Sequence, residues 1–393
     1  MKKTATVYDV AADAGVSIAT VSRVFRRPDD VRASTRETVL ASVRSLGYVP
    51  SASARGLAAR RTGVLGLFFP DFDAVDDESF DNDNDNDSDA GADVETDAAA
   101  APRRLVEIVR DMPDTGGAQR ADLYFDEVLR GSEVQAWRDG FTLMIGVGRG
   151  SNPVDIVTDI AGRVDGLALL AGSVPDSLLD HVSRRIPIVL IAGARRDDDF
   201  DHVTVANAEG MRALTRHVVD DLGVRDPVFV SGPAATADDV ERYEGFRLAL
   251  SESGIDPDAL SVLHGDFTRA GGRLVATRLL AARADAGLSK AGSGLPRALM
   301  CSNDQTALGI MEVLTAHGIR IPDDTIVTGF DGIVESRIST PRLTTVQQPM
   351  IALGRAAVSV MGRRLAEPDH APMARRLPVT LLLRESSEGS PRG

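Results

Sequence analysis

A stretch near the N-terminus, residues 7–26, carries side chains that can recognise DNA bases and phosphates. Arg23 can donate two parallel hydrogen bonds to the edge of a guanine in the major groove. The hydroxyls of Ser17, Thr20 and Ser22 can contact bases or phosphates. Because Ser17 precedes a predicted helix, it can equally be a simple helix cap. The chemistry of this stretch therefore points to nucleic-acid recognition.

These side chains need two short helices joined by a tight turn. Gly15 lies where a left-handed residue would reverse the chain. One inward face is apolar or small: Val10, Ala11, Ala14, Val16, Val21 and Val24. The second helix then presents four residues outward: Ile18, Ala19, Ser22 and Arg23. The pattern predicts a helix-turn-helix whose second helix enters the major groove.

Local signals place three helices in the first 48 residues. Thr6 and Asp9 form a plausible capping pair before the first helix. Ser17 begins a second helix, residues 17–25, and a third spans residues 34–46 and stops at Gly47. Residues 49–62 are small, polar and basic, which is typical of a linker with a marginal helical turn.

The charge is divided along the chain. The 393 residues carry a net charge of −14, yet residues 1–62 have a net charge of +6. Residues 71–101 contain thirteen acidic residues and no basic one. Affinity for phosphates depends on the local patch. A separate basic module is therefore compatible with DNA binding by an acidic protein.

Composition indicates a soluble cytoplasmic protein. The hydrophobic fraction of 43% supports sizeable cores. No apolar run approaches the length of a membrane helix, and the first residues lack the apolar region of a secretory signal. Cys301 is the single cysteine, so no intrachain disulfide can form. It lies in an apolar strand, which favours a core residue over a nucleophile.

From Val64 onward, short apolar runs alternate with amphipathic stretches. The predicted strands are 64–69, 143–147, 166–170, 188–191, 228–230, 298–301 and 326–330. The predicted helices are 123–138, 175–184, 208–222, 238–253, 271–285, 304–317 and 350–365. This alternation predicts an α/β fold with parallel sheets, and its length suits two lobes. Ligands of such sheets bind beyond the carboxyl ends of the strands.

Residues 72–122 interrupt this pattern with an acidic, low-complexity insertion, which we expect to be largely disordered. Its Asp-x-Asp repeat is similar to part of a calcium-binding loop, but the glycine and glutamate spacing of an EF-hand loop is missing. A surface insertion is the simpler interpretation, and recruitment of a partner is the alternative. Residues 286–295 predict a second, smaller loop.

Signals for an enzyme are poor. The six histidines are scattered without metal-ligand spacing, and residues 146–150 (GVGRG) lack the third glycine of a dinucleotide fingerprint. No Walker or Gly-x-Ser-x-Gly string occurs. We therefore expect no catalytic residues, no metal and no cofactor.

The chain resembles the LacI/GalR family of bacterial transcriptional repressors. The resemblance begins with VYDVAADAGVSIATVSRVF and STRETVLASVRSLGYVPSASARGLAARRT. It continues through GRVDGLALL, CSNDQTALGIMEVL, IVTGFDG, PRLTTVQQPMIALGRAA and VTLLLRESS, so that little besides the acidic insertion is outside it. It implies an all-α helix-turn-helix domain at 1–48, a hinge at 49–62 and a two-lobed periplasmic-binding-protein-like domain at 63–393.

The resemblance assigns roles at the DNA. Ile18 and Ala19 match the first base-contacting positions of the recognition helix, where they can contact thymine methyls or complement shape. Tyr8 would contact the backbone, and Arg26 would add phosphate affinity. Leu57 matches a hinge leucine that wedges into the minor groove. It can also be a helix-face leucine in a dimer contact.

The resemblance also implies an effector site between the lobes. Five residues match its ligand positions: Arg242, Phe267, Asn303, Asp331 and Gln348. Their chemistry suits a hydroxyl-rich ligand such as a sugar or a nucleoside-like molecule. Arg242 and Asp331 can instead form a salt bridge between the lobes. Asp304 can cap the following helix or contact ligand.

Departures from the family pattern put an ordinary sugar site in question. Ala192-Gly193 follows a strand where sugar-binding relatives often carry Asp, and Ala206-Asn207 replaces a common Asp-Asn pair. We expect a homodimeric repressor that binds a pseudopalindromic operator and a small molecule. The rivals are a solute-binding module or enzyme on the same fold, and a DNA-binding protein without effector control. The basic module argues against the first of these.

Overall fold

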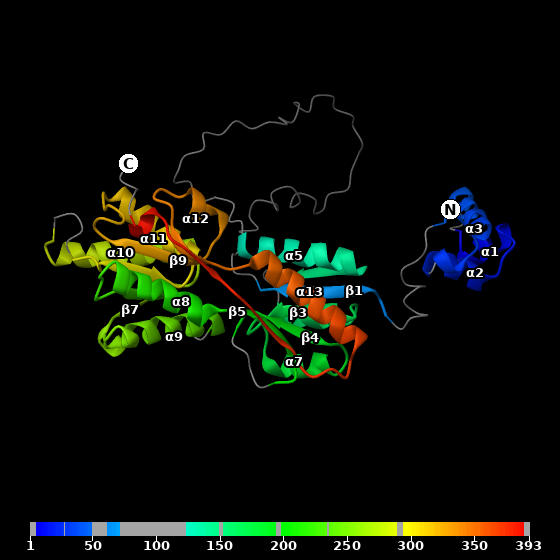
Figure 1. Ribbon diagram of the computed structural model, residues 1–393, viewed down its shortest axis with the longest axis horizontal. Coiled ribbons are helices and arrows are strands. Elements are labelled where there is room, and N and C mark those ends of the chain that lie inside the picture. The colour runs from blue at the N-terminus through cyan, green and yellow to red at the C-terminus, as the bar shows by residue number, and fades with distance from the viewer. Residues whose placement is uncertain are drawn as a thin grey trace, which may run out of the picture. The chain divides into compact units, whose positions relative to one another are not determined.

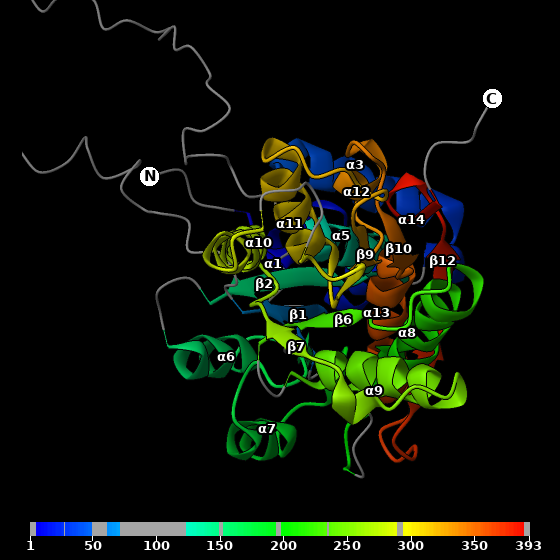
Figure 2. The same ribbon diagram turned by 90° about the vertical axis from the view of Figure 1, so that its left-hand side faces the viewer.

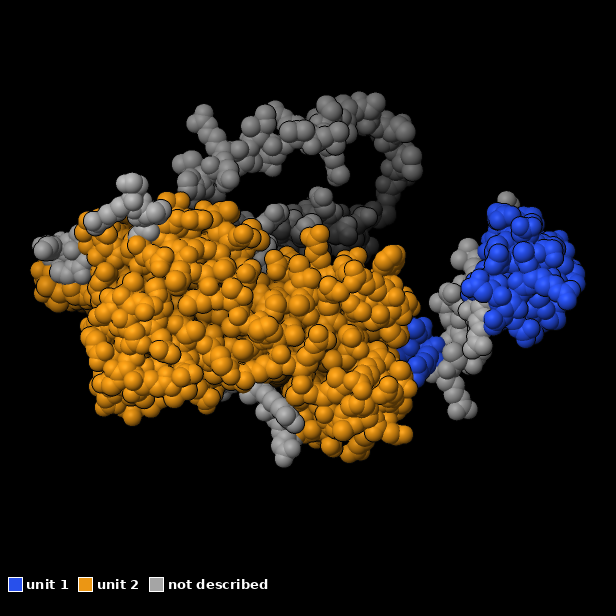
Figure 3. Space-filling view, in the orientation of Figure 1, with its two compact units in different colours: residues 1–64, 163–165 blue, residues 65–162, 166–393 orange. Residues whose placement is uncertain are grey.

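The computed structural model describes residues 5–26, 28–48, 61–70, 123–148, 152–193, 198–233, 236–288 and 294–388. The described chain forms two compact units, residues 1–64 with 163–165 and residues 65–162 with 166–393 (Figure 3). Residues 49–60 of the hinge expected at 49–62, with Leu57, and the acidic insertion expected at 72–122 lie outside the described residues. The side chain of Arg26 also lies outside them, although its backbone belongs to a helix.

The described part of the first unit contains the helices α1 (Val7–Asp13), α2 (Ile18–Arg26) and α3 (Ala33–Leu46), with a short 3-10 turn at Pro28–Asp30. The predicted capping pair is confirmed, because the Thr6 hydroxyl accepts from the Asp9 amide and Asp9 accepts from the Thr6 amide. Gly15 has φ +64°, the left-handed turn expected between α1 and α2. Gly47 ends α3 with φ +60°.

A small apolar core holds these helices together. Val10, Val21 and Val39 are fully buried, one from each helix, and Ala11 and Val24 complete the cluster. The Ser42 hydroxyl of α3 donates to the carbonyl of Val10 and to the carboxylate of Asp13. These contacts set the angle at which α2 is presented, which is a property of packing between helices and not of α2 alone.

Among its described residues, the second unit has two six-stranded sheets. The first has the order β11-β5-β4-β3-β1-β2 and the second β12-β10-β9-β8-β6-β7. The first sheet consists of β1 (Val64–Phe69), β2 (Thr142–Val147), β3 (Gly166–Leu170), β4 (Ile188–Ile191), β5 (Asp201–Val205) and β11 (Ala374–Leu377). The second consists of β6 (Val228–Ser231), β7 (Val262–His264), β8 (Ala298–Cys301), β9 (Ile326–Asp331), β10 (Thr344–Gln347) and β12 (Thr380–Leu382). The pairs β1–β3, β3–β4, β4–β5 and β5–β11 of the first sheet are parallel, whereas β12 pairs antiparallel with β10 in the second.

Helices cover both faces of each sheet (Figures 1 and 2). The first sheet is covered by α5 (Leu123–Asp139) and α13 (Met350–Ala366) on one face, and by α6 (Pro153–Ala161) and α7 (Asp176–Ser183) on the other. The second sheet lies between α8 (Asn207–Arg216) with α9 (Ala237–Glu252) and α10 (Arg269–Asp285) with α11 (Asp304–Ala316). The short helices α12 (Val334–Ile338) and α14 (Glu385–Glu388) complete the second lobe. The predicted α/β fold with parallel sheets in two lobes is confirmed.

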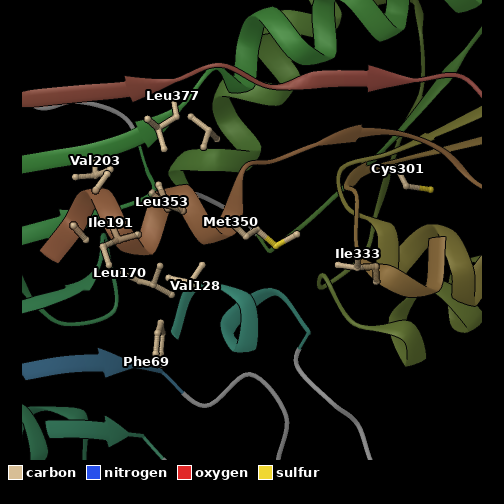
Figure 4. Packing of buried hydrophobic residues seen from close by; sticks show 14 of the residues in the cluster. Phe69, Val128, Leu170, Ile191, Val203, Cys301, Ile333, Met350, Leu353 and Leu377 are labelled. Carbon is tan, nitrogen blue, oxygen red and sulfur yellow. The ribbon is translucent and has the colours of Figure 1, made fainter. Parts of the chain in front are cut away.

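The chain passes between the two sheets three times. It leaves the first sheet after β5, returns from β10 into α13, and crosses again from β11 to β12 (Figure 1). Both lobes are therefore built from distant stretches of sequence. The largest buried cluster includes residues of both, among them Leu170, Ile191 and Leu353 by the first sheet and Cys301 and Ile333 by the second (Figure 4).

One predicted helix differs from the structure at its ends, and several observed elements were not predicted. The helix expected at 208–222 begins at Asn207 and changes to a π-helical turn at His217–Asp221. Strands β5, β7, β10, β11 and β12 and helices α6, α12 and α14 were not predicted. The missed strands are short or carry polar residues, as in the Thr344-Thr345-Val346-Gln347 stretch of β10, so their apolar signal is weak.

Candidate DNA-binding surface and effector site

The second helix of the first unit presents the side chains expected to face DNA. Ile18, Ala19 and Arg23 are exposed, and Ile18, although apolar, has 40% of its surface accessible. Thr20 and Ser22 are half-buried at the edge of this face. Val21 and Val24 point into the helix core. Helix α2 therefore has one buried face and one exposed face. Arg23 carries the single described guanidinium on the exposed face.

Ser17 caps this helix. Its hydroxyl accepts from the amide of Thr20 at 3.1 Å and lies 2.9 Å from the Thr20 hydroxyl. The capping interpretation is confirmed, and a contact with DNA stays a prediction. Tyr8 on α1 is 68% exposed, which is high for an aromatic ring and leaves it accessible to a partner.

The candidate effector site begins with Arg242, which is buried on α9. Its Nε donates to Asn207 Oδ1 at 3.0 Å and its Nη1 to the carbonyl of Ser302 at 2.8 Å. The guanidinium carbon lies 4.0 Å from the centroid of the Phe330 ring, a cation–π contact. The cation is thus fixed in position before any ligand arrives.

Asp331 ends β9 beside this guanidinium, with 3.6 Å between Arg242 Nη1 and Asp331 Oδ1. Gln348 donates from Nε2 to the same carboxylate at 2.7 Å, and its amide donates to the Asp331 carbonyl. Asp331 has φ 126°, which is strained for a residue with a Cβ. The ion pair exists, but both partners belong to the second lobe. The alternative of a salt bridge between the lobes was therefore wrong in placing the partners on different lobes.

Phe267 and Asn303 lie together at the carboxyl edge of the same sheet. The Phe267 ring packs on Gly232, and a Cβ on Gly232 would collide with this ring. Phe267 itself has φ 67°. Asn303 donates from Nδ2 to the Phe267 carbonyl at 2.7 Å. Its Oδ1 accepts from the Thr306 amide at 3.0 Å. Asn303 therefore holds the Phe267 turn in addition to lying at a predicted ligand position.

Two alternative roles were considered for Asp304, a cap of α11 or a ligand contact, and the first was wrong because Asn303 is the cap. Asp304 is instead fully buried and accepts from the amides of Gly332 and Ile333 and from the Thr345 hydroxyl. It ties α11 to the turn after β9 and to β10. No sequence pattern distinguishes two adjacent polar residues at a helix start, since either can cap.

Burial alters the acidity of both carboxyl groups. It raises the pKa of Asp331 to about 6, although the Arg242 guanidinium opposes the rise. It raises the pKa of Asp304 to about 8, with a further contribution from the negative charge of Asp331. Burial also raises the pKa of the Cys301 thiol, in agreement with the expected core position. Burial thus disfavours the charged form of both carboxyl groups.

Sequence reasoning missed Asn207 and Asp238 as members of this region. Asn207 is fully buried at the start of α8, and its Nδ2 donates to Asp238 Oδ1 and Glu241 Oε2, both at 2.9 Å. Asp238 also accepts from the Gly193 amide at 2.8 Å. The departure at Ala206-Asn207 marked the place, but its partners are distant in sequence. Only the folded chain brings them together.

Within the described residues, no group of three or more His, Cys, Asp or Glu side chains is arranged to hold a metal ion. The described helices also include none that is long and apolar enough to cross a membrane.

Two family models match the chain and together span more than half of it. Residues 6–51 match the model for bacterial regulatory proteins of the lacI family. Residues 216–387 match a periplasmic binding protein-like domain. The chain combines a lacI-family regulatory domain with a periplasmic binding protein-like domain. It is a regulatory protein rather than an enzyme.

Relatives in this family match over nearly the whole chain. The HTH-type transcriptional repressor PurR of Vibrio campbellii is 28% identical over 371 residues, 93% of each chain. Catabolite control protein A of Priestia megaterium is 25% identical over 387 residues, covering 98% of this chain and 99% of its own. Both alignments therefore span most of each chain.

Solved structures give the same correspondence. A complex of the transcriptional regulator CelR with cellobiose has a TM-score of 0.62 at 26% identity, covering 97% of this chain and 99% of that one. The lac repressor dimer bound to operator and the anti-inducer ONPF has a TM-score of 0.73 at 23% identity, covering 98% and 99%. The second likeness supports the fold.

Proposed function

We propose that this lacI-family member is a homodimeric cytoplasmic repressor that binds a pseudopalindromic operator and responds to a small molecule. The observation that carries the DNA-binding part is α2, whose apolar face is packed while Ile18, Ala19 and Arg23 remain exposed. Two such helices related by a two-fold axis would contact two half-sites. The domain limits follow as 1–48 for DNA binding, 49–62 for the hinge and 63–393 for effector binding.

At each half-site, Arg23 would pair with guanine while Ile18 and Ala19 pack on thymine methyls. Tyr8, Ser17, Thr20, Ser22 and Arg26 would contact the DNA backbone or neighbouring bases. Leu57 would wedge into the central minor-groove step. The first group would set the preferred sequence and the others chiefly the affinity.

The effector would bind at the carboxyl edge of the second sheet. Arg242, Asp331 and Gln348 supply donors and acceptors in a nearly neutral group, while Phe267 supplies a ring face. This combination favours an uncharged molecule rich in hydroxyl or ring-nitrogen groups over a multiply charged anion. Cellobiose in the CelR complex is one example of a hydroxyl-rich ligand in a related regulator.

The test is selection of bound duplexes from a random DNA pool with the full-length protein. The proposal expects enrichment of a pseudopalindrome with a flexible central step, and a dimer in sedimentation. The enriched duplex then allows sugars and nucleosides to be screened for a change in operator affinity. A folded dimer that enriches nothing at low salt would contradict the DNA-binding role.

A further inference from the structure

Asn207 joins two polar contacts that are otherwise separate. On one side its Oδ1 accepts from Arg242 Nε at 3.0 Å. On the other its Nδ2 donates to Asp238 and Glu241 at 2.9 Å each. Its side chain is fully buried, so water does not compete for these hydrogen bonds. Every polar atom of the amide is therefore used by the protein.

The second of these contacts reaches the other lobe. Asp238 Oδ1 accepts from the amide of Gly193, the residue that follows β4 of the first sheet by two positions. Gly193 has φ 74°, and a Cβ there would lie 2.7 Å from the Cβ of Ala171 and 3.4 Å from that of Ala237 on α9. The two lobes thus meet closely at this point, with a charge-assisted hydrogen bond across the contact.

Asn207 also lies where the chain first crosses between the sheets, directly after β5 and Ala206. Gln348 lies at the second crossing, directly after β10, and holds Asp331 in the same way. Arg242 is therefore hydrogen-bonded to the first crossing segment through Asn207, and Asp331 to the second through Gln348. Asn207 and Gln348 thus link this pair to two of the segments that join the lobes.

A ligand oxygen that accepts from Arg242 Nε competes with Asn207 for that hydrogen. If a ligand oxygen accepts this hydrogen, Asn207 Oδ1 loses its hydrogen-bond donor. Asn207 is then held only by the two carboxylates, and its amide can turn. Since Asp238 uses the same oxygen for Asn207 and for Gly193, a change in one bond alters the other.

We propose that Asn207 is a positioning residue that couples occupancy of the effector site to the contact between Gly193 and Asp238 across the lobes. The proposal rests on the proposed effector function of Arg242 and assigns its regulation. It requires a ligand that accepts a hydrogen bond from Arg242 Nε. Coupling of this kind shifts the balance between two arrangements of the lobes.

The test needs no effector, because a substitution at Arg242 can replace the ligand. Arg242→Lys keeps the positive charge beside Asp331 but removes the Nε donor to Asn207. Hydrogen exchange at the Gly193 amide, measured in the full-length protein with residue resolution, is the readout. We expect Arg242→Lys to speed this exchange by about threefold to tenfold, in the range of a weakened hydrogen bond.

The decisive comparison is made without Asn207. In Asn207→Ala, exchange at Gly193 should already be fast, and adding Arg242→Lys should change it less than twofold. Asn207→Asp serves as a second variant, because it keeps the acceptor for Arg242 and loses both donors to Asp238 and Glu241. Glu244→Ala, on an exposed position of the same helix, is the control and should leave the exchange unchanged.

Equal effects of Arg242→Lys with and without Asn207 would overturn the proposal, and so would no effect at all. Unchanged circular dichroism and melting temperature would show that the variants remain folded. The readout does not involve DNA or ligand. A failure to enrich an operator would therefore count against the proposed function alone, and additive exchange would count against the coupling alone.

Discussion

At the scale of single residues, Arg23 has the clearest expected effect. It is the one described guanidinium on the exposed face of α2, and a bidentate pair with guanine contributes about 1–3 kcal/mol of discrimination. We expect Arg23→Ala to weaken binding to the selected operator by roughly 5- to 150-fold and to relax the preference at one base pair. Fluorescence anisotropy with matched and single-substituted duplexes measures both quantities.

Arg44→Ala is the matched control, because Arg44 is an exposed arginine on α3, away from the face of α2. Arg44→Ala should lower the affinity for DNA less than Arg23→Ala does, and by the same factor for all duplexes. If the two variants lose affinity to the same extent on every sequence, Arg23 contacts only phosphate.

The buried carboxyl of Asp304 should make stability depend on pH. In the folded protein its pKa is raised from the ordinary 3.8 to about 8, so the folded state keeps a proton that the unfolded chain releases. The free energy of unfolding should therefore fall as pH rises from about 4 to about 8. Asp331, with its pKa raised to about 6, adds to the fall in the lower half of this window.

Asp304→Asn removes the titrating group while it keeps one acceptor for the bonds from Gly332, Ile333 and Thr345. We expect urea denaturation between pH 5 and pH 8 to give a flatter profile for this variant than for the unmodified protein. Parallel profiles would mean that Asp304 is ionised throughout and that its three hydrogen bonds compensate for burial.

At the scale of helices and strands, close packing depends on small residues between paired helices. A Cβ on Gly354 of α13 would collide with the Val128 carbonyl of α5 and with Ser132. We expect Gly354→Ala to lower the free energy of unfolding by about 1–3 kcal/mol, because α5 and α13 must move apart. Urea denaturation followed by circular dichroism measures the change.

Gly362→Ala on the same helix is the control for helix propensity. A Cβ there would lie 3.6 Å from the Phe141 ring, an ordinary contact. This variant should gain about 0.5–1 kcal/mol from the higher helix propensity of alanine. Losses of equal size in both variants would contradict the packing argument.

At the scale of the whole molecule, one buried ion pair holds the returning chain. Arg364 near the end of α13 donates to both oxygens of Asp201, which begins β5 and is 2% exposed. Asp201 also accepts from the Met373 amide, and Arg364 donates to the carbonyls of His370 and Ala371. The pair thus fixes the segment that leads into β11 and the third crossing.

Asp201→Ala should cost about 3–5 kcal/mol, because it leaves a guanidinium and a backbone amide without their acceptor. The shift of the urea midpoint measures this cost. Glu252→Ala is the control: its pair with Arg212 is exposed to water, so its midpoint should remain near that of the unmodified protein. A similar shift in both would mean that burial of the Asp201 pair adds nothing.

The sequence by itself determined the helices of the first unit and most parallel strands of the second. Their signals are local: a capping pair at Thr6 and Asp9, glycines at 15 and 47, and uninterrupted apolar runs such as 64–69 and 188–191. Local signals act over a few residues, so they can be recognised without knowing what packs against them. The positions of Arg242, Asp331 and Gln348 followed from resemblance.

The tertiary structure alone decided how these residues are connected. It placed Arg242 and Asp331 in one lobe, made Asn303 the cap in place of Asp304, and brought Asn207, Asp238 and Gly193 together from 14 to 45 residues apart. Such contacts depend on which strands are neighbours and where the chain crosses between sheets. Those arrangements arise from burial over the whole molecule, and no short stretch of sequence encodes them.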